Sequence, residues 1–205
     1  MYSPEWFVEE DPARIAQVIA AHPLCALVVQ GPEGLLANHV PVLFEAGRAI
    51  GHVALANDLH RVVPDGSEVL LIFQGHSGYI SPDWYPSKAE HHRHVPTWNY
   101  EVVHLHGAIR FHHEVKRKLA VVGKMTRHFE ALSGTGWRMA DAPRDYMDEM
   151  LANIVAFEVE ITRVQAKAKL GQNRAAADLA GAAAGLEGQG QRALAQAMRA
   201  RRAET

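Results

Sequence analysis

The chain has 205 residues, of which 48% are apolar and 21% are charged, and its formal net charge is -2. This length supports one core of ordinary size, and the charged fraction argues against extensive disorder. The small net charge excludes a whole-surface electrostatic grip on nucleic acid or on an anionic membrane, although a local basic patch stays open.

Cys25 is the single cysteine, so no disulfide can form within the chain. The first ten residues are acidic and aromatic and do not have the pattern of a signal peptide. No apolar run approaches the ~20 residues that a membrane span needs. These features predict a protein of the reducing cytoplasm, without membrane contact.

The first part of the chain predicts one short helix followed by hairpins. Asp11-Pro12 is typical of a helix start, and His22-Pro23 ends the apolar face of that helix. Turn residues then separate apolar or alternating runs, which is typical of a meander of strands. The expected elements are strands at 25–30, 35–44 and 50–54, one or two helical turns at 57–63, and a buried strand at 68–73.

The second part begins with a long loop from Ser77 to Asn99 and then alternates clearly over 101–113. Helical spacing of apolar residues predicts a helix over 114–132, and a shorter helix follows Pro143. Alternation returns over 154–165, and Ala-rich sequence from Ala175 predicts a helix broken near Gly188. The sum is a mainly β, α+β fold of about six or seven antiparallel strands with peripheral helices. A closed or partly open barrel is the natural solution because closure removes sheet edges.

Two segments are candidate ligand sites. Residues 78–100 hold two of the four tryptophans and three of the five tyrosines, interspersed with hydroxyl, amide and lysine side chains. Such a loop suits a planar ring that is both stacked and hydrogen-bonded, but it also suits packing over the core or a subunit interface. Residues 51–61 read as a strand that ends in a helix start, where Asn57 and Asp58 could cap the helix and Arg61 could add charge for a phosphate.

Thirteen histidines raise the question of a metal. His104 and His106 have the spacing of a chelating pair on one strand face, His112 lies further along that face, and His91, His92 and His94 lie in the nearby loop. No HExxH motif, CxxC motif or suitably spaced carboxylate completes such a site. A solvated or interface strand face is therefore the favoured interpretation, and no metal is predicted.

No catalytic motif stands out, because GxSxG, Walker A and GxGxxG patterns are all missing. The segment from Lys167 to Arg174 reads equally well as a ligand-closing loop and as a solvated turn. The arginines near the end of the chain are more often a solvated helix face than a DNA contact; they are Arg192, Arg199, Arg201 and Arg202.

Taken together, the motifs resemble those of the PaiB-like FMN-binding regulators, a branch of the FMN-binding split barrels. The resemblance covers residues 1 to about 186, so residues 1–186 are expected to form the split-barrel domain and 187–205 a C-terminal helical tail. The matching stretches are Met1-Tyr2-x-Pro4 with Phe7, Ala37-x-His39-x-Pro41, Gly51 to Ala54 with Ala56-Asn57 and Arg61, Tyr79 to Tyr85 with Lys88, Val95 to Tyr100, Asp141 to Pro143, and Gln172 to Arg174 with Asp178 and Gly181. Within the pattern Lys-Trp-Lys-Leu-Ser-Gln-Asn, the chain departs at Ala168 and Gly171.

The resemblance implies a split barrel whose homodimer interface holds FMN. By looser similarity to pyridoxamine-phosphate-oxidase-like barrels, Asn38 to Pro41 would line the isoalloxazine, Asn57 and Arg61 would lie at the phosphate, and the aromatic loop would close the site. The implied cofactor-binding residues are Asn38, His39, Val40, Pro41, His52, Asn57, Arg61, Tyr79, Ser81, Trp84, Tyr85, Lys88, Thr97, Trp98, Asn99, Gln172 and Asn173.

Two functions follow from this resemblance. The first is an FMN-holding transcriptional regulator, with DNA as a partner through the resemblance alone. The alternative is an enzyme, either a flavin-dependent oxidoreductase or a haem-handling split barrel in which His104 or His106 would matter. No catalytic residue is assigned, because no general base stands in a defined setting.

Overall fold

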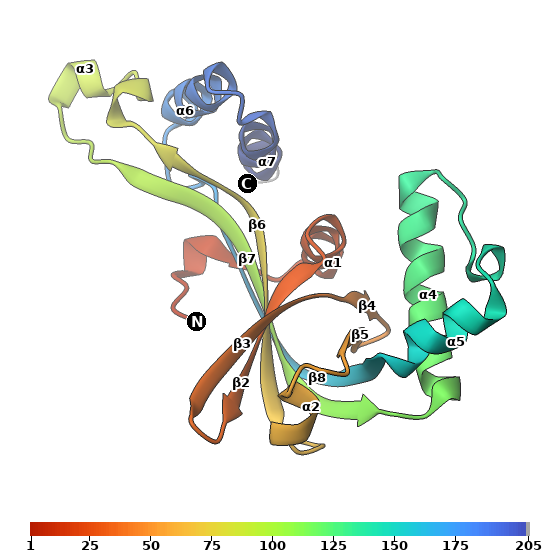
Figure 1. Ribbon diagram of the computed structural model, residues 1–205. Coiled ribbons are helices and arrows are strands. Elements are labelled where there is room, and N and C mark those ends of the chain that lie inside the picture. The colour runs from red at the N-terminus through yellow and green to blue at the C-terminus, as the bar shows by residue number, and fades with distance from the viewer. Residues whose placement is uncertain (204–205) are drawn as a thin grey trace. The chain divides into compact units, whose positions relative to one another are not determined.

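The computed structural model describes residues 1–203, and the side chains of residues 1–201 (Figure 1). The helices are α1 (Pro12–Ala21), α2 (Leu59–Val62), α3 (Lys88–His91), α4 (Val115–Ser133), α5 (Arg144–Ala152), α6 (Ala176–Gly188) and α7 (Arg192–Ala203), with short 3-10 turns η1 (Glu5–Phe7), η2 (Pro82–Trp84) and η3 (Met139–Asp141). The strands are β1 (Val8–Glu9), β2 (Leu24–Gly31), β3 (Gly34–Pro41), β4 (Leu43–Glu45), β5 (Arg48–Ala54), β6 (Glu68–Ile80), β7 (Thr97–His112) and β8 (Ile154–Lys169).

The strands of the described residues form one eight-stranded sheet in the order β3-β2-β6-β7-β8-β5-β4, and β1 pairs with β8. The pairings of β2 with β3 and β6, and of β5 with β4 and β8, are antiparallel. The predicted α+β fold with an antiparallel sheet is therefore confirmed. It has one more strand than the upper expectation because β4 separates from β3 at Val42 and because β1 adds to β8.

The chain divides into two compact units, which are described separately. One unit contains Pro23–Phe73 and His104–Val164. Its core forms because alternate residues of each strand point to the same face, as in the buried Leu27, Leu71, Leu105 and Phe157. Helix α4 ends at Gly134, whose positive φ of 71° gives the left-handed cap that favours glycine.

The other unit contains Met1–His22, Gln74–Val103 and the described part of Gln165–Thr205. In it α1 begins where Asp11 accepts a hydrogen bond from the backbone N–H of Ala13 and Pro12 fixes the first helical position. Helices α6 and α7 lie side by side (Figure 1). Their alanines and leucines pack with Ile80, Tyr85 and Leu170 into a buried cluster.

The predicted elements appear with changed ends. The helix predicted after Pro143 and the break near Gly188 are both present, as α5 and as the gap between α6 and α7. The largest difference lies in the segment predicted as a loop over 77–99. Strand β6 runs on to Ile80 and β7 begins at Thr97, so η2, α3 and their connections remain between the two strands. Within residues 1–203, no helix is long and apolar enough to cross a membrane.

Candidate functional site

The predicted flavin residues fall into two groups, one in each compact unit. In the unit of Pro23–Phe73 and His104–Val164, the strongest feature is the turn at Asn57 between β5 and α2. Its side-chain Nδ2 donates to Oδ1 of Asn38 at 2.7 Å, and its Oδ1 accepts from the backbone N–H of Leu59 at 2.9 Å. Asn57 thus starts α2 and holds the turn against β3, which joins two of the sequence-predicted residues.

Arg61 lies one turn further, on α2. Its guanidinium forms an ion pair with Asp58 at 2.6 Å and donates to the backbone oxygen of Leu55 at 3.1 Å. The backbone N–H groups of Leu59 and Arg61 are engaged within the turn. The exposed guanidinium, rather than the start of this four-residue helix, is therefore the group here that could meet a phosphate.

Strand β3 and His52 complete this group. Along β3 the exposed His39 and Pro41 alternate with the less accessible Asn38 and Val40, as the strand period requires. Nδ1 of His52, on β5, is buried and finds no hydrogen-bond partner among the described residues. Burial lowers the pKa of His52, so the imidazole is held neutral. An unsatisfied imidazole nitrogen is a group that a polar ligand could satisfy.

The conspicuous aromatic segment in the other unit divides by burial. Tyr85 is buried and Trp84 packs against the α6–α7 cluster. The indole of Trp84 lies against Gly185, where an added Cβ would come 2.2 Å from the ring, and its backbone oxygen lies against Gly181, where the distance would be 2.1 Å. The Gly181–Gly185 stretch therefore gives space to Trp84, and these two aromatics serve packing within this unit.

Four further polar side chains fix the same segment to the start of α6. Asp178, buried at 4% exposure, accepts from the hydroxyl of Ser87 at 2.7 Å, and Nε2 of His94 lies 2.8 Å from that hydroxyl oxygen. Arg174 donates to Nδ1 of His94 at 3.3 Å and lies over the ring of Tyr85. In a catalytic triad the carboxylate binds Nδ1 of the histidine and the serine lies at Nε2. Here the carboxylate of Asp178 binds Ser87, and Nδ1 of His94 accepts from Arg174, so these residues do not form a triad.

Tyr79 and Trp98 form the exposed part of the aromatic segment. They lie on neighbouring strands with their ring centroids 6.3 Å apart in an edge-to-face arrangement, and they are 43% and 52% exposed. Beside them, Lys169 donates to Oγ1 of Thr97 at 2.6 Å and to the backbone oxygen of Trp98 at 2.8 Å. Burial, followed by the nearby cations, keeps the pKa of Lys169 below its ordinary value. This surface can offer aromatic contact to a ring.

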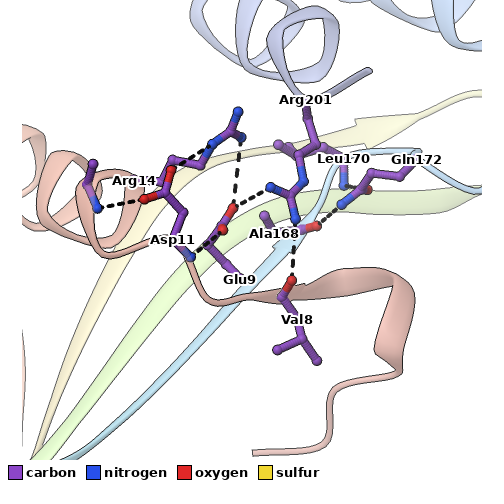
Figure 2. A network of polar contacts seen from close by, with 9 residues as sticks. Val8, Glu9, Asp11, Arg14, Ala168, Leu170, Gln172 and Arg201 are labelled. Carbon is purple, nitrogen blue, oxygen red and sulfur yellow. Dashed lines mark hydrogen bonds and ion pairs between the residues drawn. The ribbon is translucent and has the colours of Figure 1, made fainter. Parts of the chain in front are cut away.

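The remaining predicted residues have engagements of their own. Asn99 is buried and its Nδ2 lies 3.5 Å from the sulfur of Met198. Gln172 is also buried, accepts from the backbone N–H of Leu170 at 2.8 Å and donates to the oxygen of Ala168 at 2.5 Å (Figure 2). Ser81 caps η2, Lys88 forms an ion pair with Asp83, and Asn173 is exposed after β8.

The structure also describes the surroundings of the histidines and of Cys25. Among the described side chains, no group of three or more histidine, cysteine, aspartate or glutamate residues could hold a metal. Nδ1 of His106 accepts from Arg163 at 2.9 Å. Burial raises the pKa of Cys25 to about 12, so this thiol is unreactive. The family motif includes Arg174 and Asp178, but it does not predict that they fix the aromatic segment. Ser87 was not predicted at all, because no local pattern in the sequence identifies its hydroxyl.

Of the tail arginines, Arg199 pairs with Glu187, and Arg201 pairs with Glu9 at 2.8 Å (Figure 2). Arg192 is exposed, and the side chain of Arg202 lies outside the described residues. Two of the four arginines, for which a solvated helix face was the favoured interpretation over a DNA contact, are therefore engaged in ion pairs within the protein.

The residues of the first group fit an FMN. A flavin offers ring carbonyls and nitrogens to the unsatisfied imidazole of His52 and a phosphate to Arg61, and it would lie along a strand with exposed positions. Asn38 and Asn57 fix each other, so their positions are set before a ligand arrives.

Comparisons with known proteins point to the same cofactor. Residues 1–163 match the family described as "Putative FMN-binding domain". The chain is 27% identical over 180 residues to protease synthase and sporulation protein PAI 2 of Bacillus subtilis, covering 85% of this chain and 83% of that protein. It is 34% identical over 152 residues to an uncharacterized protein of Aspergillus fumigatus, covering 66% of this chain and 58% of that protein. The chain thus spans less than two thirds of its fungal relative.

Solved structures show the same fold at low sequence identity. The FAD- and haem-binding protein of Mycobacterium smegmatis aligns with a TM-score of 0.61 and 14% identity over 80% of this chain and 74% of that one. The flavocytochrome Anf3 of Azotobacter vinelandii aligns with a TM-score of 0.57 and 14% identity over 81% of this chain and 71% of that one. The family, the fold and FMN as the cofactor, all predicted from sequence motifs, are thereby confirmed: the chain belongs to the FMN-binding-domain family and has the fold of the flavin-binding split barrels.

Proposed function

We propose that this protein is a homodimer that holds FMN between its subunits and acts as a transcriptional regulator. The observation that supports FMN binding is the hydrogen bond between Asn38 and Asn57, which fixes two amide side chains. The exposed Arg61 and the unsatisfied His52 belong to the same compact unit. A bound flavin would supply a planar ring that exchanges electrons. The chain's own residues would hold its phosphate and hydrogen-bond its ring.

Strand β3 supports the homodimer. It stands at one end of the strand order, and five of its eight residues are exposed. Leu35 and Leu36 are 76% and 37% exposed although they point to opposite faces, so neither face of this strand end is covered. An uncovered apolar edge strand is a site of association. A second copy seated there would close over a flavin that lies along Asn38 to Pro41, and the partner's aromatic segment would supply the ring contact.

Helix α4 supports the interaction with DNA. It carries five lysines and arginines against one glutamate. At about 100° per residue, Lys116, Arg117, Lys124 and Arg127 share one face, opposite the buried Lys118 and Met125. Lys124 pairs with Glu45, but Lys116, Arg117 and Arg127 are exposed, whereas Arg199 and Arg201 of α7 are held by Glu187 and Glu9. The cationic face of α4, rather than the tail, is therefore the phosphate-contacting surface we propose.

The flavin site is tested by titrating FMN into the protein and into two alanine variants. Asn57→Ala removes the turn that holds Asn38, and we expect FMN affinity to fall about tenfold or more. Asn153→Ala removes an exposed amide at the end of α5 and should leave FMN affinity unchanged. Equal affinity in the wild type and in Asn57→Ala would contradict the assignment.

The regulator is tested by selecting bound duplexes from a random DNA pool and measuring their affinity against salt. The double variant Lys116→Ala/Arg127→Ala should reduce the salt slope by about 2, because each lost phosphate contact removes about one unit. Arg192→Ala/Arg199→Ala should leave the slope unchanged. If the second pair alone lowers the slope, the tail is the contact; if no duplex binds above the random pool, the regulator proposal fails.

A further inference from the structure

A cavity of about 520 Å³ lies within the unit that contains α1 and α7, and it has no part in the proposed flavin site. Its walls come from α1, from β6, β7 and β8, and from α7. Ile15, Val18, Val103 and Leu170 give it apolar surface. The α7 side is lined by Ala193, Ala197 and Ala200, whose small side chains leave the space open. This volume suits a small organic molecule.

One carboxyl group of this cavity lacks a cationic partner. Glu101 lies on β7 and is half-buried, and none of the described lysines and arginines forms an ion pair with it. Gly75 leaves room for it, because a Cβ there would lie 3.0 Å from Cβ of Glu101 and 3.4 Å from its carboxylate oxygen. Burial raises the pKa of Glu101, and the charge of His76, the backbone N–H of His76 and the charge of Arg14 only partly offset this effect. The ionised carboxylate is therefore left short of compensation.

The imidazoles near Glu101 offset its loss of solvation only in part. The rings of His22 and His76 meet edge to face at 4.8 Å, and both residues line the cavity. Burial and the neighbouring His76 lower the pKa of His22, so a positive charge on it is disfavoured. Neutral imidazoles can donate and accept hydrogen bonds but carry no charge.

The other acidic groups of the cavity are already compensated. Glu9 is buried and lies 2.8 Å from Arg201 and 3.8 Å from Arg14, and it accepts from the backbone N–H of Asp11 (Figure 2). Asp11 lies 3.6 Å from Arg14. Lys167 also lines the cavity, but its ammonium donates to the backbone oxygen of Tyr2 at 3.2 Å and lies over the rings of Tyr2 and Tyr100. Glu101 is therefore the carboxyl group of this cavity that a ligand's positive charge could pair with.

We propose that this cavity binds a small organic cation, a primary or secondary amine with an apolar body. Its ammonium group pairs with the Glu101 carboxylate and its hydrogen bonds extend to the neighbouring imidazoles. The body packs against Ile15, Val18 and the alanines of α7. Such a ligand replaces the solvation that burial removes from the carboxylate, and a hydrogen-bonded charge pair of this kind is stronger than a neutral contact.

The test uses the purified protein, with and without added FMN, and isothermal titration calorimetry with two amines, benzylamine and tryptamine. Each is compared with its neutral counterpart, benzyl alcohol or tryptophol. At least one amine should bind with a saturable signal and about tenfold more tightly than its alcohol. Glu101→Gln should remove this difference, whereas Glu90→Gln, at an exposed site on α3, should preserve it.

A second variant locates the ligand. Ala197→Leu adds side-chain volume at a partly buried position that lines the cavity, so it should weaken amine and alcohol alike without changing FMN binding. Failure of both amines to bind the folded protein would overturn the proposal. Equal affinity for an amine and its alcohol, or amine binding that survives Glu101→Gln, would also overturn it. None of these outcomes depends on whether the flavin site is assigned correctly.

Discussion

The carboxylate of Asp178 accepts both the backbone N–H and the hydroxyl of Ser87, at 3.1 and 2.7 Å. The two residues are 91 positions apart in the chain, so this pair ties the start of α6 to the segment after η2. Burial alone would raise the pKa of Asp178, but the two hydrogen bonds and the charges of His94 and Arg174 lower it overall. The aromatic segment is thus a fixed part of its unit rather than a free loop.

Removing this carboxylate should destabilise the protein. Asp178→Ala leaves the Ser87 N–H and hydroxyl without their acceptor, and hydrogen bonds to charged groups contribute ~1.5–3 kcal/mol each, so we expect a loss of about 2–4 kcal/mol. Asp83→Ala removes an exposed carboxylate that pairs with Lys88 and should cost less than about 1 kcal/mol. Urea unfolding measures both. Similar losses in the two variants would contradict the anchoring role of Asp178.

A methyl group at Gly185 should displace Trp84. The added Cβ would come 2.2 Å from the indole, a contact that forces the ring or the helix to move. Overpacking of this kind costs about 1–3 kcal/mol, and the altered indole environment should change the tryptophan fluorescence. Gly188→Ala is the matched change near the end of α6, where nothing lies within 4 Å, and it should be neutral or slightly stabilising. A stable Gly185→Ala protein with unchanged fluorescence would exclude this packing.

The stability contribution of Glu101 should depend on pH in a defined direction. Because burial raises its pKa in the folded state, folding holds the proton more tightly than the unfolded chain does. That contribution is present below the unfolded pKa and is lost as the pH rises through the folded pKa. Glu101→Gln removes the dependence, so its melting temperature relative to the wild type should be higher at about pH 7.5 than at about pH 4.5. The opposite order would show that the charged form is favoured by folding.

Arg201, near the end of the chain, should contribute to the free energy of unfolding. Arg201→Ala removes the 2.8 Å partner of the buried Glu9. Loss of one partner from a buried pair costs ~3–5 kcal/mol, and Arg14 remains close to Glu9, so we expect about 2 kcal/mol in urea unfolding. Arg192→Ala, at an exposed position of the same helix, should change stability by less than about 0.5 kcal/mol. If both variants unfold at the wild-type urea concentration, the Glu9–Arg201 pair does not stabilise the fold.

Much of the fold could be predicted from the local periodicity of apolar residues. The alternation over 101–113 places Val103, Leu105, Ile109 and Phe111 on one face, and all four are buried in β7. The extension of β6 to Ile80 was missed because Gly75, His76 and Gly78 have little strand propensity of their own. Pairing along the sheet decides their conformation, and a local pattern does not report on that pairing.

The candidate site was only partly accessible from sequence. Asn57 and Asp58 were both predicted as caps of this helix; the side chain of Asn57 does accept the N–H of Leu59, whereas the side chain of the N-cap residue Asp58 makes no cap hydrogen bond. The burial of Trp84 depends on Gly181 and Gly185, which lie about a hundred positions away, so composition alone could not separate packing aromatics from exposed ones. The four-residue spacing of those glycines was a signal that one helix face accepts a bulky neighbour.

The flavin site between two subunits is tested most directly by titrating the purified apoprotein with FMN, following flavin fluorescence and measuring the mass of the complex by light scattering. We expect saturable binding of one FMN per chain in a particle of twice the chain mass. A folded protein that leaves flavin fluorescence unchanged at all FMN concentrations would contradict the flavin site, and FMN binding by a monomer would contradict its position between subunits.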